Sequence, residues 1–311
     1  MTSDRHPGPG GVDALSVEVL EALQRGTDLH GLSPLSIAGR LDLRSIRLGG
    51  EESGQAAGID VLPGAILSDV DFSGAEAPGL RLVRARAVNC VFEKANLDGL
   101  EARATDFVGC SFAGASLRGA QLSLPLDDRY SSYEDVDFSR VTLSGASCVD
   151  ASFKRCVFSR LKMGAMSFRG ANFVDCSFSG VLRKVVFSGD SLTGRELPGR
   201  VMQNVDFSNA VLRDVEFRGI DLDGVSLPEG DPHILVKHYQ CVLGKILGRL
   251  PVSGQPFTYG LRAYLAAERG HSHPAREIGI WHRASLGKTP EEQEYAIRML
   301  RACESECEGD G

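Results

Sequence analysis

Histidine is the side chain best suited to general acid–base work near neutral pH, and it is unevenly distributed in this chain. The sequence holds 7 histidines, and none of them lies between residues 59 and 227. His233, His238 and His282 follow that region, so an enzymatic site would have to use the C-terminal part. Neither a Walker-type phosphate loop nor a Gly-x-Ser-x-Gly nucleophile motif occurs in the sequence. We therefore assign no catalytic residue and expect no cofactor.

The 8 cysteines fall into two groups with different possible chemistry. Five of them lie in the central region: Cys90, Cys110, Cys148, Cys156 and Cys176. Cys148 stands at a large central position and the other four where small apolar side chains recur, so we expect buried, reduced thiols there. Cys303 and Cys307 could join His271 and His273 in a zinc site, but this spacing matches no standard zinc-finger pattern. We assign no metal site.

The residues of the central region recur with a period of five, which neither a helix nor a strand produces. A large apolar residue returns at every fifth position, with a small residue two places before it, as in Ala95-Asn-Leu97 and Ala171-Asn-Phe173. All but one of the 14 phenylalanines lie in this region, always at the large position. This period fits a coil with four short sides, each of which turns one large side chain inward.

Phenylalanine also recurs at every twentieth position, which is the length of one such coil. These predicted core residues are Phe72, Phe92 and Phe112 in one run, and Phe138, Phe158 and Phe178 in another. They predict like side chains stacked from coil to coil, as in a solenoid. Between the two runs the phase breaks, which predicts that about six residues within Pro125–Asp135 bulge out of the coil.

A second irregularity concerns charge. Asp190, Arg195 and Arg200 fall at three successive small-residue positions, where an unpaired charge would be buried at high cost. We expect Ser188–Arg200 to loop outward, and pairing of these charges inside the core is the alternative.

The pentads are the signature of the pentapeptide-repeat family, whose consensus resembles Ala-(Asp/Asn)-Leu-x-x. The resemblance covers residues 59–227 and implies an all-β solenoid, a right-handed quadrilateral β-helix. Residues 1–58 are predicted to hold a cap helix over Asp13–Arg25, an early coil from Leu41 to Leu48 and a flexible insertion at Gly49–Gly58. Helical spacing over residues 228–311 predicts a C-terminal α-helical module of four helices, one of them around Ile278 and Trp281.

Charge and hydropathy argue against several function classes. The chain carries 34 Lys and Arg against 41 Asp and Glu, a net charge of −7, without a basic block. We therefore expect no direct nucleic-acid binding. No apolar run reaches the roughly 18 residues needed to span a bilayer, and the N-terminus lacks an apolar secretory core. We expect a cytoplasmic protein without membrane association.

These observations favour a non-catalytic scaffold that binds a protein partner. The predicted bulge supplies the candidate binding residues: Asp127, Asp128, Arg129, Tyr130, Tyr133 and Glu134. Its two tyrosines are suited to act as anchors in an interface. By resemblance, the helical module is expected to form a homodimer.

Two alternatives stay open. Family members that shield DNA gyrase carry a projecting loop, so the resemblance implies protection of gyrase or another topoisomerase from an inhibitor, a form of antibiotic self-resistance. A DNA mimic should be strongly acidic, however, and residues 59–227 are close to neutral. The second alternative is an enzyme or accessory protein in peptide natural-product maturation, with its site in the helical module.

Overall fold

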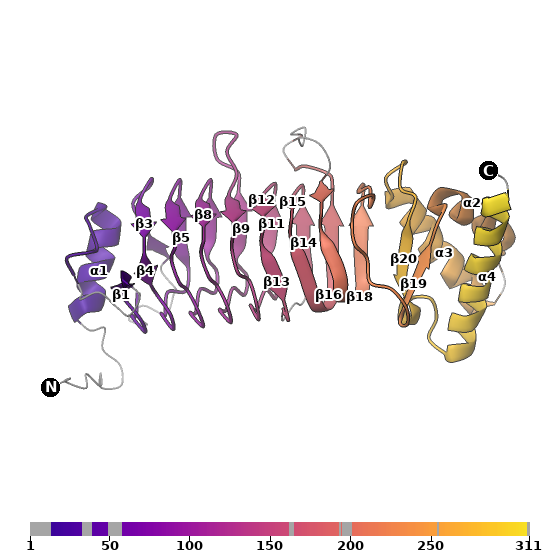
Figure 1. Ribbon diagram of the computed structural model, residues 1–311, viewed down its shortest axis with the longest axis horizontal. Helices are drawn as coiled ribbons and strands as arrows, with labels where there is room; N and C mark the ends of the chain where they lie inside the picture. Colours follow the sequence, from indigo (N-terminus) through magenta and orange to yellow (C-terminus); the bar gives the residue numbers. More distant parts are fainter. Residues whose placement is uncertain are drawn as a thin grey trace. The chain divides into compact units, whose positions relative to one another are not determined.

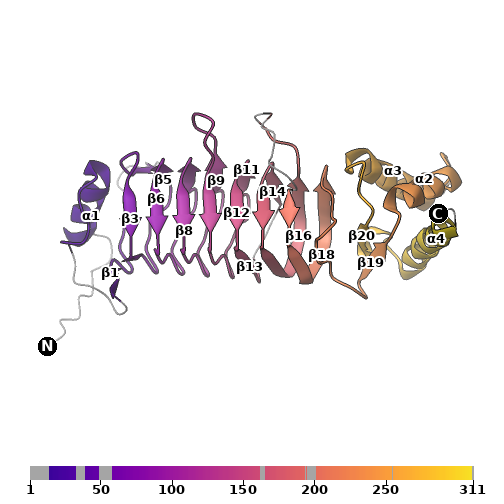
Figure 2. The same cartoon turned by 45° about the horizontal axis from the view of Figure 1, so that its top comes forward.

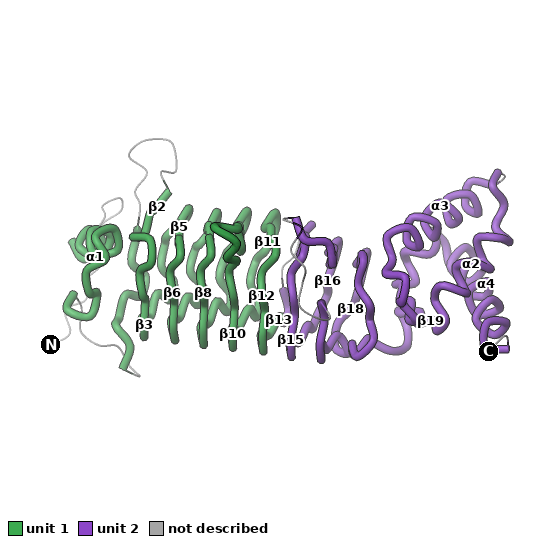
Figure 3. The backbone as a smooth tube through the Cα atoms, turned by 90° about the horizontal axis from the view of Figure 1, so that it is seen from above, with its two compact units in different colours: residues 1–158 green, residues 159–311 purple. Residues whose placement is uncertain are grey.

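The computed structural model describes residues 14–32, 39–48, 58–161, 165–192, 194, 201–253 and 255–309. The chain divides into two compact units, residues 1–158 and residues 159–311, and each is described by itself (Figure 3). Short parallel strands wound into coils occur in both units. Unit 1 adds an N-terminal helix to its coils, and unit 2 adds a C-terminal module of helices.

Unit 1 is a β-helix whose strands run parallel along its sides (Figure 1). The strands are β1 (Leu41–Asp42), β2 (Ile59–Asp60), β3 (Ile66–Ser68), β4 (Val70–Asp71), β5 (Leu80–Val83), β6 (Arg86–Val88), β7 (Glu101–Arg103), β8 (Asp106–Val108), β9 (Gln121–Leu124), β10 (Ser132–Glu134), β11 (Ser147–Val149) and β12 (Ser152–Lys154). One side stacks β3, β6, β8, β10 and β12, and another stacks β2, β5, β7, β9 and β11. β1 pairs with β4 as the early coil, and β13 (Val157–Ser159) crosses into unit 2.

Polar side chains stacked on the outside of unit 1 show the coil length. Asn89 Nδ2 donates to Asp69 Oδ1 at 3.2 Å, and Asn96 Nδ2 donates to Glu76 Oε2 at 2.7 Å, in each case across 20 residues. One corner of the coil is turned in successive layers by Asp69, Asn89 and Gly109, with φ of 53°, 53° and 62°. Asp, Asn and Gly adopt this left-handed region most readily. The predicted four-sided coil is therefore confirmed.

The core of unit 1 contains a column of stacked phenylalanine rings. Ring centroids of Phe72 and Phe92 lie 5.3 Å apart, those of Phe92 and Phe112 4.9 Å, and those of Phe112 and Phe138 5.5 Å. Phe158 continues the column 4.9 Å from Phe138. All five side chains are buried. Burying each ring contributes on the order of 1.5–3 kcal/mol, so the column is a main source of stability.

The small positions beside the rings hold the thiols that the sequence placed there. Cys90 Sγ donates to the Leu67 carbonyl at 3.4 Å, and Cys110 Sγ donates to the Ala87 carbonyl at 3.5 Å. The five cysteines of the coils are buried, and none of these five forms a disulfide. They fill the core as small apolar groups.

Helix α1 (Ala14–Arg25) covers the first coil of unit 1. Val19 and Leu23 are buried on its inner face, and Gly26 ends it with a φ of 69°. The Leu23 carbonyl accepts the Leu62 amide hydrogen at 2.9 Å, which ties the helix to the coil edge. The predicted N-cap Asp13 and most of the predicted insertion, residues 49–57, lie outside the described residues.

The first strands of unit 2 are β14 (Met166–Arg169), β15 (Asn172–Val174), β16 (Ser177–Ser188), β17 (Met202–Gln203) and β18 (Asp206–Arg218). Of these, β16 and β18 are much longer than the strands of unit 1. β16 and β18 are parallel, and the rings of Phe178 and Phe207 stack on each other at 4.6 Å. Asn204 Nδ2 donates to Asp175 Oδ1 across 29 residues, more than the usual coil.

The extra residues of this coil lie between β16 and β17, in the segment predicted to loop outward. The Asp190 amide donates to Ser188 Oγ at 3.2 Å, directly after β16. Arg195 and Arg200 lie outside the described residues.

The C-terminal module consists of helices packed with one antiparallel strand pair (Figure 2). Its elements are β19 (His233–Val236), α2 (Tyr239–Arg249), α3 (Pro256–His271), β20 (Gly279–His282), the 3₁₀ helix η2 (Arg283–Ser285) and α4 (Pro290–Gly309). The predicted helix around Ile278 and Trp281 is wrong, because Gly279–His282 pairs with β19 instead. The last helix is capped at its start, since Thr289 Oγ1 accepts the Glu292 amide hydrogen at 3.3 Å.

Candidate functional site

One coil of unit 1 is longer than its neighbours by six residues. Ser132 Oγ donates to Asp106 Oδ1 at 2.5 Å across 26 residues, whereas Asn89 and Asp69, stacked in an earlier coil, are 20 residues apart. The additional residues form a projection between β9 and β10 (Figure 2). We call residues 125–130 the hairpin loop.

The tip of the hairpin loop is a tight two-residue turn. The backbones of Leu126 and Arg129 exchange two hydrogen bonds of 3.0 Å. Asp127 and Asp128, between them, have φ of 48° and 57°. Two left-handed residues in a two-residue loop are typical of a type I′ turn, which Asp tolerates better than most residues. The tip therefore has a defined conformation that follows from its own sequence.

Buried hydroxyl groups hold the base of the hairpin loop. The Ser131 amide donates to Ser123 Oγ, and the Thr105 amide donates to Ser131 Oγ, both at 3.2 Å. Ser131 Oγ in turn donates to the Ala102 carbonyl at 3.2 Å. The three hydroxyl side chains are fully buried. Since buried polar groups are costly when unpaired, this network fixes where the chain leaves and re-enters the coil.

Ion pairs steady the exposed part of the hairpin loop. Asp127 pairs with Arg84 of the coil, and Arg129 Nη2 lies 3.6 Å from Asp106 Oδ2. Such exposed pairs contribute little to stability, but together they restrict the orientation of the tip. Asp128 lies at the tip with its side chain exposed.

Tyr133 is not a surface anchor, contrary to the prediction. It lies in β10 with 1% of its surface exposed, and its ring stacks between Phe107 and Phe153 at 4.9 Å from each. Its hydroxyl donates to the Leu122 carbonyl at 2.6 Å, and burial raises its pKa well above the usual value. Once the six extra residues are set aside, Tyr133 occupies a large position of the repeat, and that register was the signal for its burial.

Of the other predicted binding residues, Tyr130 lies beside the tip of the loop and Glu134 lies in a strand of the coil. Tyr130 is half-buried beside the tip. Glu134 lies in β10, where Arg155 Nη2 and Lys154 Nζ lie 2.7 and 3.1 Å from its carboxylate. The hydrogen bond from Arg155 lowers the pKa of Glu134, so this carboxylate is held ionised and paired. The candidate site therefore narrows to Asp127, Asp128 and Arg129, with Tyr130 at their side.

The structure brings two of the three candidate catalytic histidines together. His233 and His282 are paired residues of β19 and β20, with ring centroids 5.9 Å apart. His233 Nε2 accepts the Leu212 amide hydrogen at 3.0 Å, and His282 Nδ1 accepts the Ala284 amide hydrogen at 3.1 Å. His238 is exposed at the start of α2. Each ring of the pair thus accepts a backbone hydrogen bond with one nitrogen, which indicates a structural role for these histidines.

The zinc alternative is contradicted at Cys307, which forms a disulfide with Cys241. The Cα atoms of the two cysteines lie 6.2 Å apart, and the bond joins α4 to α2. Cys303 is free and buried one turn earlier on α4. Among the described residues, no group of three His, Cys, Asp or Glu side chains could hold a metal ion.

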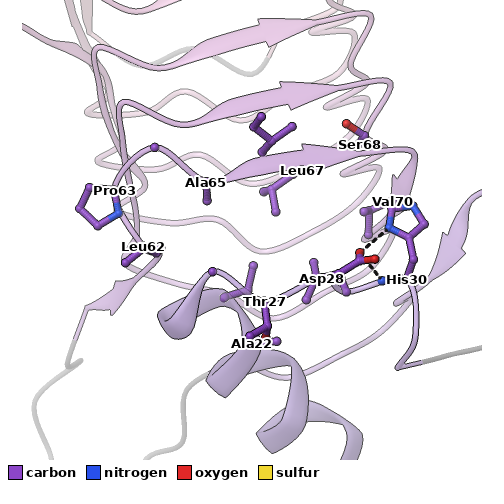
Figure 4. Close-up of a pocket in the computed structure, with 15 residues that line it drawn as sticks. Ala22, Thr27, Asp28, His30, Leu62, Pro63, Ala65, Leu67, Ser68 and Val70 are labelled. Carbon is purple, nitrogen blue, oxygen red and sulfur yellow. Dashed lines mark hydrogen bonds and ion pairs between the residues drawn. The ribbon is translucent and has the colours of Figure 1, made fainter.

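A cavity of about 430 Å³ lies where α1 meets the first coil of unit 1 (Figure 4). Leu29, Leu67 and Val70 supply apolar lining, and Asp28 and His30 lie close together on one side of it. His30 Nδ1 and its backbone amide each lie 3.0 Å from Asp28 Oδ1, and these hydrogen bonds lower the pKa of Asp28. None of the predicted site residues lines this cavity.

A family model described as pentapeptide repeats matches the chain in 8 copies, over residues 65–99, 129–160, 137–180 and 199–227. No curated protein matches the chain. Within the parts of the chain that the structure describes, no helix is both long and apolar enough to cross a membrane.

Several solved structures resemble the chain in fold. HetL, a pentapeptide repeat protein involved in heterocyst differentiation regulation from the cyanobacterium Nostoc sp. Strain PCC 7120, is 17% identical, with 60% of this chain and 85% of that chain covered and a TM-score of 0.34. Full-length QnrB1, a plasmid-mediated fluoroquinolone resistance protein, is 19% identical, with coverages of 61% and 92% and a TM-score of 0.22. Rfr23 from the cyanobacterium Cyanothece 51142 is 15% identical, with coverages of 60% and 85% and a TM-score of 0.16. Sequence identities and TM-scores this low do not indicate a shared function.

Proposed function

The chain belongs to the pentapeptide-repeat family, and from this premise we propose that it is a non-catalytic scaffold that binds a protein partner through the hairpin loop. The observation that carries the proposal is the construction of this loop. Its tip is a defined turn, its base is fixed by buried hydroxyls, and its charged residues face outward.

A β-helix does not need such a loop for stability. Ordering six additional residues costs conformational entropy, and the neighbouring coils close without them. A loop that is already ordered loses less entropy when it binds, which favours recognition. The entropy cost of ordering this loop is therefore better explained by a role in binding than by a role in folding.

The exposed charges indicate the chemistry of the partner. Asp127 and Asp128 are both exposed, and within the described residues only Asp127 of the two forms an ion pair with a coil residue, Arg84. We expect the partner to offer a basic or hydrogen-bond-donating pocket to this acidic tip, with Arg129 at its rim. Complementary charge of this kind contributes mainly to specificity and to the rate of association.

Site-specific photo-crosslinking tests the proposal directly. A photoreactive residue replaces Asp128 in one protein and Lys94 in a matched control. Both positions are exposed and have a φ of 57°, so the two replacements carry the same backbone cost. In cells of the source organism, we expect one defined protein to cross-link from position 128 and not from position 94. Equal cross-linking from both positions, or none from position 128, would contradict the proposal.

Charge removal at the tip provides the quantitative test. Asn replaces Asp at positions 127 and 128, because Asn also adopts the left-handed conformation and keeps the turn. We expect the double variant to fold like wild type and to bind the cross-linked partner at least about tenfold more weakly, which corresponds to 1.4 kcal/mol. Unchanged affinity measured by calorimetry would move recognition away from the tip.

DNA gyrase is the specific partner that we propose to test first, on the basis of the family resemblance. The assay is gyrase supercoiling in the presence of an inhibitor, with wild-type protein and with the Asp127→Asn/Asp128→Asn variant. Protection by wild type and its loss in the variant would support gyrase as the partner. Absence of protection by wild type would remove gyrase and leave the scaffold proposal to the cross-linking experiment.

A further inference from the structure

The outer edge of β18 is covered at its start by a bridge from Asp206 to Ser226, and further along by a histidine side chain. The Leu212 amide of β18 donates its hydrogen to His233 Nε2 at 3.0 Å. His233 opens β19 and has 6% of its surface exposed. A buried backbone amide without an acceptor is costly, so this bond fastens the C-terminal module to β18.

The hydrogen bond determines the protonation state of the ring. An acceptor nitrogen carries no proton, so His233 is neutral with its proton on Nδ1. His282, its paired residue on β20, is likewise neutral, because its Nδ1 accepts the Ala284 amide hydrogen. A doubly protonated imidazole has only donors and cannot serve either amide.

We propose that His233 and His282 form a pH-sensitive latch, which holds the β19–β20 pair against the edge of β18 at neutral pH and releases it in mild acid. Protonation of His233 removes the acceptor of the Leu212 amide and places a cation in a buried position. Protonation of His282 adds a second positive charge 5.9 Å away, between ring centroids, and removes the acceptor at the start of η2.

Charged groups on several elements lie around the pair. Asp231 precedes β19 and pairs with Arg283 of η2 at 3.0 Å, and Glu294 of α4 lies 3.6 Å from Arg283. β18 contributes Arg213 and Asp214. Their signs are mixed, so no single neighbour compensates a cation in this place.

The pKa values follow this arrangement. Burial lowers the pKa of His233, and the neighbouring His282 lowers it further, whereas Asp231 acts in the opposite direction. Burial also lowers the pKa of His282, followed by the charge of Arg213, against Asp214 and Asp231.

The sign of the pH dependence follows from these directions. When the latch opens, each ring returns to an ordinary pKa of about 6.5 and binds a proton more readily than in the closed form. The closed form is therefore fully stable above about pH 6.5 and loses stability as the pH falls below it. Each histidine changes the opening equilibrium by at most about tenfold per pH unit within this window.

The chain offers substitutions that preserve each hydrogen bond and remove the proton site. In His233→Gln, the amide oxygen can reach the place of Nε2. In His282→Asn, the side-chain amide oxygen replaces Nδ1 as the acceptor of the Ala284 amide hydrogen. Asn side chains commonly accept such a bond from the backbone two residues on. The double variant is thus closed at every pH if the latch is the pH-sensitive element.

Hydrogen exchange of the full-length protein, corrected for the intrinsic rate, reports opening at the Leu212 amide. For wild type we expect a constant opening equilibrium from pH 8.0 to 7.0 and an increase of at least about tenfold from pH 6.5 to 5.0. For the double variant we expect no increase. An opening equilibrium in wild type that does not change with pH would overturn the proposal. An equal increase in the double variant would also overturn it, because groups other than the two histidines, such as carboxylates, would then cause the opening.

A measurement on wild type alone covers the case in which a variant does not fold. Nuclear magnetic resonance titration follows the ring protons of His233 as the pH falls. We expect His233 to titrate below the ordinary histidine pKa of about 6.5. Titration of His233 at or above that pH would overturn the latch.

Discussion

Tyr133 shows how a single side chain links the core to the hairpin loop. Its ring stacks between those of Phe107 and Phe153, so it packs in the core as a phenylalanine would. Its hydroxyl donates to the Leu122 carbonyl, at the point where the chain leaves the coil. The hydroxyl is therefore a polar contact inside an otherwise apolar column.

Two substitutions separate these roles. Tyr133→Phe leaves the Leu122 carbonyl without its partner and should cost about 1 kcal/mol of unfolding free energy. Tyr133→Ala also empties the slot in the column and should cost about 3–5 kcal/mol, as should Phe112→Ala in the neighbouring column. Urea unfolding measures all three. If Tyr133→Phe costs nothing, the hydroxyl makes no net contribution and packing alone holds this residue.

At the scale of elements, the hairpin loop is an addition to a coil that is otherwise complete. Ser131 occupies the small position and Tyr133 the large position of the pentad that follows the loop. The residues that can be removed without disturbing the register are therefore 125–130, with Ser131 kept for its contacts to Ser123 and Thr105. These six residues lie within the predicted range of Pro125–Asp135, so the predicted bulge is confirmed.

Deleting residues 125–130 should leave the β-helix intact. Leu124 then follows the course of Ala104, which has a φ of 48°, so we expect a cost of about 1–2 kcal/mol. Adding Leu124→Asn should recover part of it. The control is deletion of residues 126–130 only, which shifts the register and turns Tyr133 out of the core. Circular dichroism melting compares them, and equal stability of the two deletions would contradict the assigned register.

At the scale of the whole molecule, the C-terminal module has more apolar surface than its own core covers. Val252 is 71% exposed and Tyr259 is 56% exposed, next to and on α3. The disulfide between Cys241 and Cys307 joins α2 and α4 across 66 residues of chain, which restricts the unfolded module. A stable module with exposed apolar residues is suited to association.

We expect the protein to form a homodimer through this module. Light scattering at tens of micromolar should give about twice the monomer mass of 33.4 kDa. Replacing Val252 and Tyr259 by Asp should shift the equilibrium to monomer without changing the helical signal, because both side chains lie outside the core. A wild-type protein that is monomeric at this concentration would contradict the expectation.

The sequence by itself determined the features that depend on local periodicity. A large residue in every fifth position and a small one beside it can be buried together only in a four-sided coil, so the β-helix, its phenylalanine column and its thiols were predictable. The break in the repeat between Leu122 and Phe138 likewise predicted a loop of about six residues there.

Tertiary structure alone decided which residues far apart in the sequence come into contact. The pairing of His233 with His282 and the bond between Cys241 and Cys307 each join positions whose own neighbourhoods carry no signal of the partner. A strand of four residues such as Gly279–His282 is stabilised by its antiparallel partner and not by its own sequence, which is why it was mistaken for a helix.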